Sequence, residues 1–75
     1  MGYLELKVLN YLRNNGSITV KTCENNIGST ELRKLISNLR HRGYGINDYW
    51  EQGFNRYGIK TRWKRYYLEK EVGAN

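Results

Sequence analysis

The segment STELRKLISNLRHRGYGI, from Ser29 to Ile46, carries the pattern of an amphipathic helix with both ends marked. Its apolar residues recur at helical spacing and define one face, formed by Leu32, Leu35, Ile36 and Leu39. The first turn supplies hydrogen-bond acceptors and a negative charge for its free amides, from Ser29, Thr30 and Glu31. The last turn is cationic, and Gly43 after it can adopt the left-handed conformation that ends a helix. We therefore predict a helix over about residues 29–42.

The opposite face of this helix is polar and cationic, and it carries Arg33, Lys34, Ser37 and His41. A helix that buries leucines on one side and presents such residues on the other fits the major groove of DNA. Arg33 and Lys34 stand on its first turns, the part that faces base edges when a helix enters the groove by its N-terminal end. An arginine can bond a guanine edge through two donors, which supplies about 1–3 kcal/mol of discrimination between bases.

The charge of the chain is strongly positive for its length. Its 75 residues contain 13 Lys and Arg against 7 Asp and Glu, a net charge of +6, which favours polyanionic partners. Cations alternate with aromatic residues and no acid between Arg56 and Arg65. A solvated basic face is the simpler explanation of such a run, but a basic strand beside a basic helix favours phosphate binding. We predict phosphate contacts for Arg56, Lys60, Arg62 and Lys64.

Enzymatic and metal-binding functions find little support in the residues present. The chain has one His, one Cys, no paired carboxylates at a cleft and no glycine-rich phosphate loop. Cys23 and His41 alone cannot complete a four-ligand zinc site. We interpret Cys23 as a small packed side chain, because no spacing places a base beside it. We expect no enzyme activity, no cofactor, no small-molecule substrate and, since no apolar run reaches spanning length, a cytoplasmic protein without a membrane partner.

The residues before Ser29 predict two further helices. Residues 3–14 form the first, with Leu4, Val8, Leu9 and Leu12 along one face. A very short strand at Ser17 and Ile18 follows, and then a second helix from a Thr19 cap to about Ile27. Because apolar and polar residues also alternate there, an extended conformation over residues 17–22 is an alternative. Gly28 then separates the second and third helices.

The residues after Gly43 predict a β-hairpin. We expect strands over residues 44–50 and 60–68, joined by a flexible tip over residues 51–58. Tyr66 and Leu68 should close the core, with a bulge as one way to fit the last strand. Residues 69–75 should fray. The predicted fold is therefore α+β, in one domain over residues 1–75 with its core in residues 3–68.

This order of elements resembles the winged helix-turn-helix over residues 3–68. More narrowly, it resembles small helix-turn-helix proteins encoded by bacteriophages and prophages. The segments that carry the resemblance are GSIT (16–19), LRKLISNLRHRGYGI (32–46), NRYG (55–58) and the basic strand ending in RYYL (65–68). It implies three helices with a small antiparallel sheet, a third helix in the major groove and a wing on the backbone or minor groove. The polar second helix departs from the pattern.

The resemblance implies DNA contacts by Thr30, Arg33, Lys34 and Ser37 on the helix and by Asn55, Arg56, Lys60 and Arg62 in the wing. We add Ser29 and His41 beside the first group and Lys64 beside the second. The implied function is sequence-specific binding of double-stranded DNA, in transcription regulation or in marking a site for replication or excision, in the host cytoplasm if the gene is a phage's. A single module buries only about 600–1,000 Å² on DNA, so strong specificity would need a homodimer or a partner protein.

Two other functions fit parts of the sequence. A protein-interaction module that modulates a host protein would use exposed apolar residues, with Leu6, Tyr11, Tyr49, Trp50 and Phe54 as its contact set. A single-stranded nucleic acid binder would stack bases on Trp50, Trp63 and the tyrosines. Exposed aromatics near the hairpin would favour the first function, and an exposed cation-lined third helix favours duplex DNA.

Overall fold

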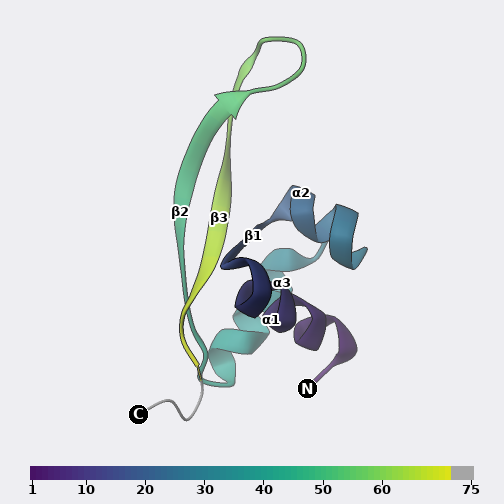
Figure 1. The fold of residues 1–75 in the computed structure, drawn as a ribbon, viewed down its shortest axis with the longest axis vertical. Coiled ribbons are helices and arrows are strands. Elements are labelled where there is room, and N and C mark those ends of the chain that lie inside the picture. The colour runs from purple at the N-terminus through teal and green to yellow at the C-terminus, as the bar shows by residue number, and fades with distance from the viewer. Residues whose placement is uncertain (72–75) are drawn as a thin grey trace.

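The structure, a computed structural model, describes residues 1–71. Its elements are α1 (Tyr3–Asn15), β1 (Ser17–Thr19), α2 (Val20–Thr22), the π-helical turn η1 (Cys23–Ile27), α3 (Leu32–His41), β2 (Gly45–Phe54) and β3 (Lys60–Lys70). The strands form an antiparallel sheet in the order β1-β3-β2. The helices pack together at one end, and β2 and β3 continue past them as a projecting hairpin (Figure 1). The predicted α+β class and winged arrangement are confirmed.

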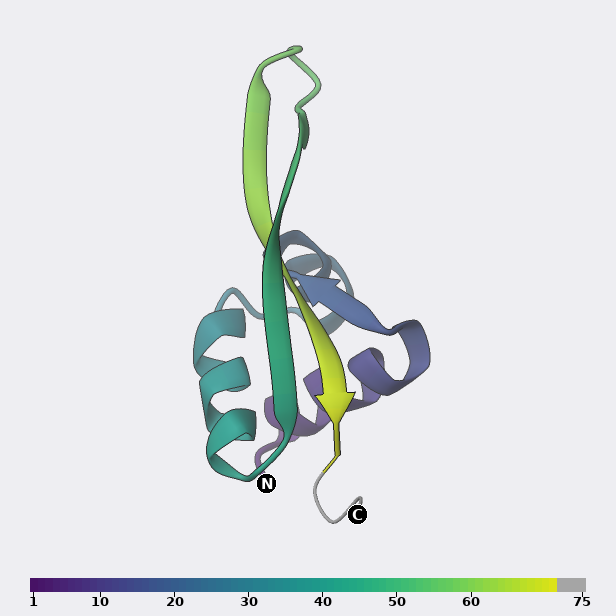
Figure 2. The same ribbon diagram turned by 90° about the vertical axis from the view of Figure 1, so that its left-hand side faces the viewer.

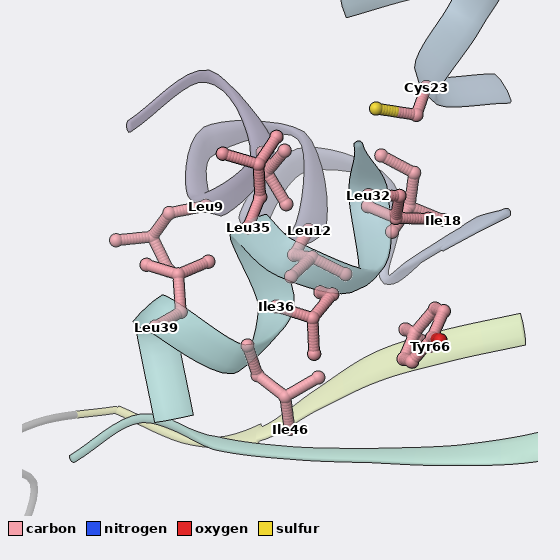
Figure 3. Close-up of a cluster of buried hydrophobic side chains, with 11 residues drawn as sticks. Leu9, Leu12, Ile18, Cys23, Leu32, Leu35, Ile36, Leu39, Ile46 and Tyr66 are labelled. Atoms are coloured by element: carbon pink, nitrogen blue, oxygen red, sulfur yellow. The ribbon is translucent and has the colours of Figure 1, made fainter. Parts of the chain in front are cut away.

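The core lies between the three helices and the base of the sheet. Side chains from α1, β1, η1, α3 and the two long strands meet in one cluster (Figure 3), formed by Val8, Leu9, Leu12, Ile18, Cys23, Leu32, Leu35, Ile36, Leu39, Ile46 and Tyr66. The predicted apolar stripes of α1 and α3 point into it, and Tyr66 closes it from β3 with Leu68 packed alongside. Burial of this apolar surface fixes α3 on the sheet, which leaves the cationic face of α3 outside.

Helix α3 is shorter at its start than we predicted. It begins at Leu32, because the Ser29 hydroxyl accepts a hydrogen bond from the Glu31 backbone amide at 3.1 Å. This bond over two residues is a local turn that competes with a helical turn, so Ser29 and Thr30 belong to the connection, and Glu31 takes the N-cap position without a side-chain hydrogen bond to the helix. The end of the helix lies near its predicted position, with Gly43 at φ 102°.

The second helix begins at Thr19 as predicted, where the threonine Oγ1 accepts from the Thr22 amide. After one turn it widens into η1, where the Gly28 amide bonds the Cys23 carbonyl oxygen at 2.9 Å, five residues back. Gly28 then adopts the left-handed conformation. The alternative prediction, an extended conformation over residues 17–22, is correct only as far as Thr19, because strand β1 ends there.

Both hairpin strands are longer than we predicted. Strand β2 continues through Gly53 to Phe54, so the turn at the tip is confined to residues 55–59. At the other end β3 runs to Lys70, and Arg13 forms an ion pair with Glu71. Our prediction that the chain frays from residue 69 is therefore wrong for residues 69–71, and residues 72–75 lie outside the described part. Gly45 pairs with Lys70 and Ile46 with Leu68, which leaves Glu69 as the extra residue of a bulge in β3.

Candidate nucleic-acid interface

The outward face of α3 is an exposed cationic surface. Its exposed residues are those that the sequence placed opposite the leucine stripe, together with Thr30 just before the helix: Thr30, Arg33, Lys34, Ser37 and His41. Arg33 and Lys34 have no ion-pair partner among residues 1–71, although Arg40 near the end of α3 and Arg42 just after it do. These two cations are therefore available to an external anion.

Two predicted contacts at the ends of α3 are less well placed. Ser29 is buried, and its hydroxyl oxygen already accepts from Glu31, so it does not face solvent as a groove residue would. His41 is exposed but stands at the C-terminal end of α3, where the chain turns into the start of β2. Ten residues of strand separate that point from the wing tip, about 30 Å at 3.3 Å per residue. The N-terminal half of α3 is accordingly the half nearer the wing.

The cations of β3 share one face of the hairpin, which we call the inner face. Residues paired directly across antiparallel strands lie on the same side, and alternate pairs repeat that side. The inner face thus runs from the core pair Ile46 and Leu68 outward through four more pairs, Asp48–Tyr66, Trp50–Lys64, Gln52–Arg62 and Phe54–Lys60. Tyr66 packs on the helices, so by register the three cations stand on the same strand face as Tyr66, farther along a hairpin that twists as it leaves the helices (Figure 2).

Arg40 connects α3 to this inner face. Its Nε donates to the Ile46 carbonyl oxygen at 2.8 Å, its Nη2 lies 3.0 Å from Asp48 Oδ2, and its guanidinium stands over the Tyr66 ring. The other Asp48 oxygen lies 3.8 Å from Lys64 Nζ. Asp48 therefore holds helix and wing in a fixed relation, and it offsets part of the charge of Lys64. That lysine is half-buried and is a poorer phosphate ligand than predicted.

Trp50 forms the middle of the inner face. Arg62 stands over its ring at 4.8 Å from the ring centroid and Lys64 at 5.0 Å. Cation–π contacts of this kind are worth about 0.5–1 kcal/mol at exposed sites, enough to bias the two long side chains toward the ring. Trp50 is still 57% exposed, so the cluster presents an aromatic ring and two cations to solvent.

The opposite face of the hairpin is held by Glu51. Its Oε1 accepts from Trp63 Nε1 at 2.7 Å and from Arg65 Nε at 2.6 Å, and Arg65 Nη1 donates to the Ser17 hydroxyl. The hydrogen bonds from Arg65 and Trp63 hold the pKa of Glu51 below its ordinary value. The Trp63 ring lies over Gly53, where a Cβ would come within 2.7 Å of it. Gly53 is therefore a strand residue that makes room for a tryptophan, and our prediction of a turn there is wrong.

Asn55 builds the turn at the wing tip. Its Oδ1 accepts from the amides of Tyr57 and Ile59 at 2.9 and 3.0 Å, and its backbone bonds Ile59 and Gly58. Gly58 takes a φ of 75°. We predicted Asn55 as a DNA contact, but its oxygen is engaged in the turn and only its amide NH₂ remains for an external acceptor. Arg56, Lys60 and Arg62 are exposed as predicted and have no ion-pair partner in the described chain.

A cleft that the sequence did not predict separates the second helix from the wing. It has a volume of about 810 Å³ and is lined on the helix side by residues that include Lys21, Asn25 and Asn26, and on the wing side by Phe54, Arg62 and Trp63. The polar character of the second helix was the signal for this surface. From the sequence, these polar residues indicate only a poor helix propensity. Their position across the cleft from a cationic strand is known from the fold alone.

Other classes of site find no support among the described residues. No group of three or more His, Cys, Asp or Glu side chains in residues 1–71 could hold a metal ion. Cys23 is fully buried, and burial raises the pKa of its thiol, which disfavours the nucleophilic thiolate. In the same part of the chain, no helix has the length and apolar character needed to cross a membrane.

A family model described as a winged helix-turn-helix domain matches residues 4–71, which include the whole sheet and all of the helices except Tyr3, the first residue of α1. Comparisons with curated proteins and with solved structures found no match. The winged helix-turn-helix is a DNA-binding fold and is not typically enzymatic, in agreement with the free cations on α3 and the wing. The chain belongs to the winged helix-turn-helix domain family, and this membership supports DNA binding in general.

Proposed function

We propose that this protein binds double-stranded DNA in a sequence-specific manner, with the N-terminal half of α3 in the major groove and the wing on the adjacent backbone or minor groove. The carrying observation is the separation of cations into two groups. Five cations form ion pairs within the fold, Arg40 and Lys64 with the same carboxylate: Arg13, Arg40, Arg42, Lys64 and Arg65. Among residues 1–71, the cations of α3 and the wing without an ion pair are Arg33, Lys34, Arg56, Lys60 and Arg62, whereas Lys7, Lys21 and Lys70 are unpaired elsewhere.

The two surfaces divide the work of recognition. Arg33 and Lys34 project from a rigid helix whose four apolar residues are buried, so their positions are fixed well enough to read base edges. Arg56, Lys60 and Arg62 lie on a hairpin and suit phosphates, which set affinity and register without reading sequence. The biological role that we propose is transcription regulation or the marking of a site for replication or excision, and a phage or prophage origin stays a prediction.

Binding to random-sequence duplex DNA across a salt series tests this function. With about five phosphates neutralised, the logarithm of the affinity should fall with the logarithm of salt concentration at a slope near −4 to −5. The double variant Arg33→Ala, Lys34→Ala should bind more weakly at every salt concentration. Arg42→Ala is the matched control, because it removes a cation that the fold already pairs with Glu5 on α1. Failure of the wild-type protein to bind any duplex at low salt would refute the proposal.

A second candidate is a protein-interaction module, and a specific observation favours it. Of the predicted contact set, Leu6, Tyr49, Trp50 and Phe54 are exposed, whereas Tyr11 is half-buried against the core. Exposed aromatics by the wing were the feature that we expected of this function. The DNA proposal explains the unpaired cations of α3 as well, and an interaction module does not need them. Loss of duplex binding in the salt series would make this second candidate the stronger one.

A further inference from the structure

The tip of the wing carries a group of large apolar side chains that the fold does not use. Phe54 and Tyr57 are each 73% exposed and Ile59 is 61% exposed, and none of them joins the core cluster. The other large exposed apolar residues are spread over the N-terminus, α1, α2 and the middle of β2. Exposed apolar side chains gathered at one projecting point of a small soluble domain mark an interaction site.

The positive charge around the wing tip indicates the kind of surface that its apolar side chains contact. No acidic residue occurs from Gln52 to Leu68, and Arg56, Lys60 and Arg62 surround the apolar group. Arg56 also stands over the Tyr57 ring at 5.3 Å from its centroid. An apolar point within a ring of unpaired cations complements a surface whose rim is anionic and whose interior is aromatic and apolar. The minor groove of DNA has that character where a base step is opened, because phosphates line its edges and the aromatic faces of the bases become accessible between them.

The turn that holds these side chains is stiff. Four hydrogen bonds converge on Asn55, two to its Oδ1 and two to its backbone, within a five-residue connection. A preorganised turn loses little conformational freedom when it enters a groove, so more of its interaction energy appears as binding. Phosphate contact alone needs neither this stiffness nor apolar side chains.

We propose that Phe54 and Ile59 act as a wedge that enters the minor groove, partly unstacks a base step and bends the duplex, with Tyr57 against the sugar edge. This inference rests on the proposed function, since the wing must first be brought to DNA. Proteins that insert such residues kink DNA by about 20–90°, most easily at flexible steps such as TA. The cations beside the wedge hold the phosphates on both sides of the opened step.

The experiment uses the full chain and a hairpin duplex of about 16 alternating A·T pairs, in which 2-aminopurine replaces alternate adenines and the two ends carry a fluorescence donor and acceptor. Any register of the wing then lies near a reporter. On saturation with wild-type protein, 2-aminopurine fluorescence should rise by about twofold or more, and energy transfer between the ends should increase. The double variant Phe54→Ala, Ile59→Ala should lose both signals but still bind with an unchanged salt slope, measured by anisotropy.

Tyr3→Ala is the matched control, because Tyr3 is 72% exposed at the start of α1, far from the wing (Figure 1). It should keep both signals. Saturating binding without a rise in fluorescence or transfer would overturn the wedge and leave the proposed function standing. Absence of duplex binding would overturn both. Wing-dependent binding to vesicles of phosphatidylserine and phosphatidylcholine, together with unchanged duplex signals in the wing variant, would instead assign the apolar tip to a lipid surface and refute the wedge.

Discussion

At the scale of single residues, the Glu51 carboxylate makes the wing sensitive to acid. Its folded-state pKa lies below its unfolded value because Arg65 and Trp63 donate to the charged form. The stabilisation is therefore complete above the ordinary Glu pKa of about 4.3 and is lost as the pH falls through the lower folded-state value. We predict that the Trp63 indole N–H resonance shifts toward that of a free indole as the pH falls from about 6 to about 3.

The variant Glu51→Gln separates charge from hydrogen bonding in this prediction. A glutamine oxygen can still accept from Trp63, but it does not titrate, so the Trp63 resonance of the variant should be independent of pH in that range. The Trp50 indole has no hydrogen bond to Glu51 and serves as the internal reference. An equal acid-induced shift in wild-type protein and variant would show that the Glu51 carboxylate is not the cause.

Cys23 provides a second prediction at this scale. The side chain is fully buried and its thiol pKa is raised by burial, so the thiolate is scarce and inaccessible. We expect iodoacetamide to leave the native protein unmodified over hours and to label it rapidly in denaturant. Fast labelling under native conditions, at a rate independent of protein stability, would contradict the packing of η1 against the core.

At the scale of elements, the wing and α3 should contribute to DNA binding in different ways. The double variant Lys60→Ala, Arg62→Ala removes two proposed phosphate contacts, so the salt slope should become shallower by about 1.8, at about 0.9 for each phosphate. Its affinity should fall by a similar factor on every duplex sequence. Binding of a panel of duplexes from about 50 to about 200 mM salt measures both quantities.

The control for the wing variant is Lys7→Ala, which removes an exposed cation of α1 that stands over Tyr3. It should change the slope little if α1 faces away from DNA. An unchanged slope in the wing variant, or an equal change in both variants, would indicate that the wing lysine and arginine remain in solvent when DNA binds.

The elements also show where sequence reasoning succeeds and where it stops. Helix α3 could be predicted because four apolar residues at helical spacing have one way to be buried together. Its start could not, because a single hydroxyl bond from Ser29 competes with the helical turn. We predicted Gly53 as a turn residue, but glycine occurs both in turns and where another group approaches the backbone closely. Only the position of the Trp63 ring over Gly53 shows that the second explanation applies here.

The candidate DNA-binding site, like the fold, could be predicted from the sequence only in part. Exposure of Arg33 and Lys34 follows from their place between buried residues on one helix, a property of local sequence. Exposure of Lys60 and Arg62 does not, because Arg62 lies on the same strand face as the buried Tyr66 and is exposed only because the hairpin projects beyond the helices. Ion-pair partners could not be predicted in this way. Lys64 and Asp48 are far apart in the sequence, and they come close only because of the register of the hairpin strands. The cleft between the second helix and the wing depends on tertiary packing in the same way.

At the scale of the whole molecule, the long hairpin gives the protein its shape and its reach. The molecule extends 44 Å along its longest axis against 24 and 20 Å across, and the wing makes up the projecting end (Figure 1). On the proposed function, a wing of this length would let one small domain contact a groove beyond the one proposed for α3. One module buries only about 600–1,000 Å² on DNA, so we predict that strong specificity would need a second copy of the chain or a partner protein beside it.

The central claim is that α3 and the inner face of the wing form one DNA-binding surface. The most direct test is an NMR titration of ¹⁵N-labelled protein with a random-sequence duplex at low salt. We predict that amide shifts concentrate in residues 30–37 and 52–62 and move together with one binding curve, with little change on the outer side of α1. Shifts confined to α1, or shifts in the wing without any in residues 30–37, would contradict the claim.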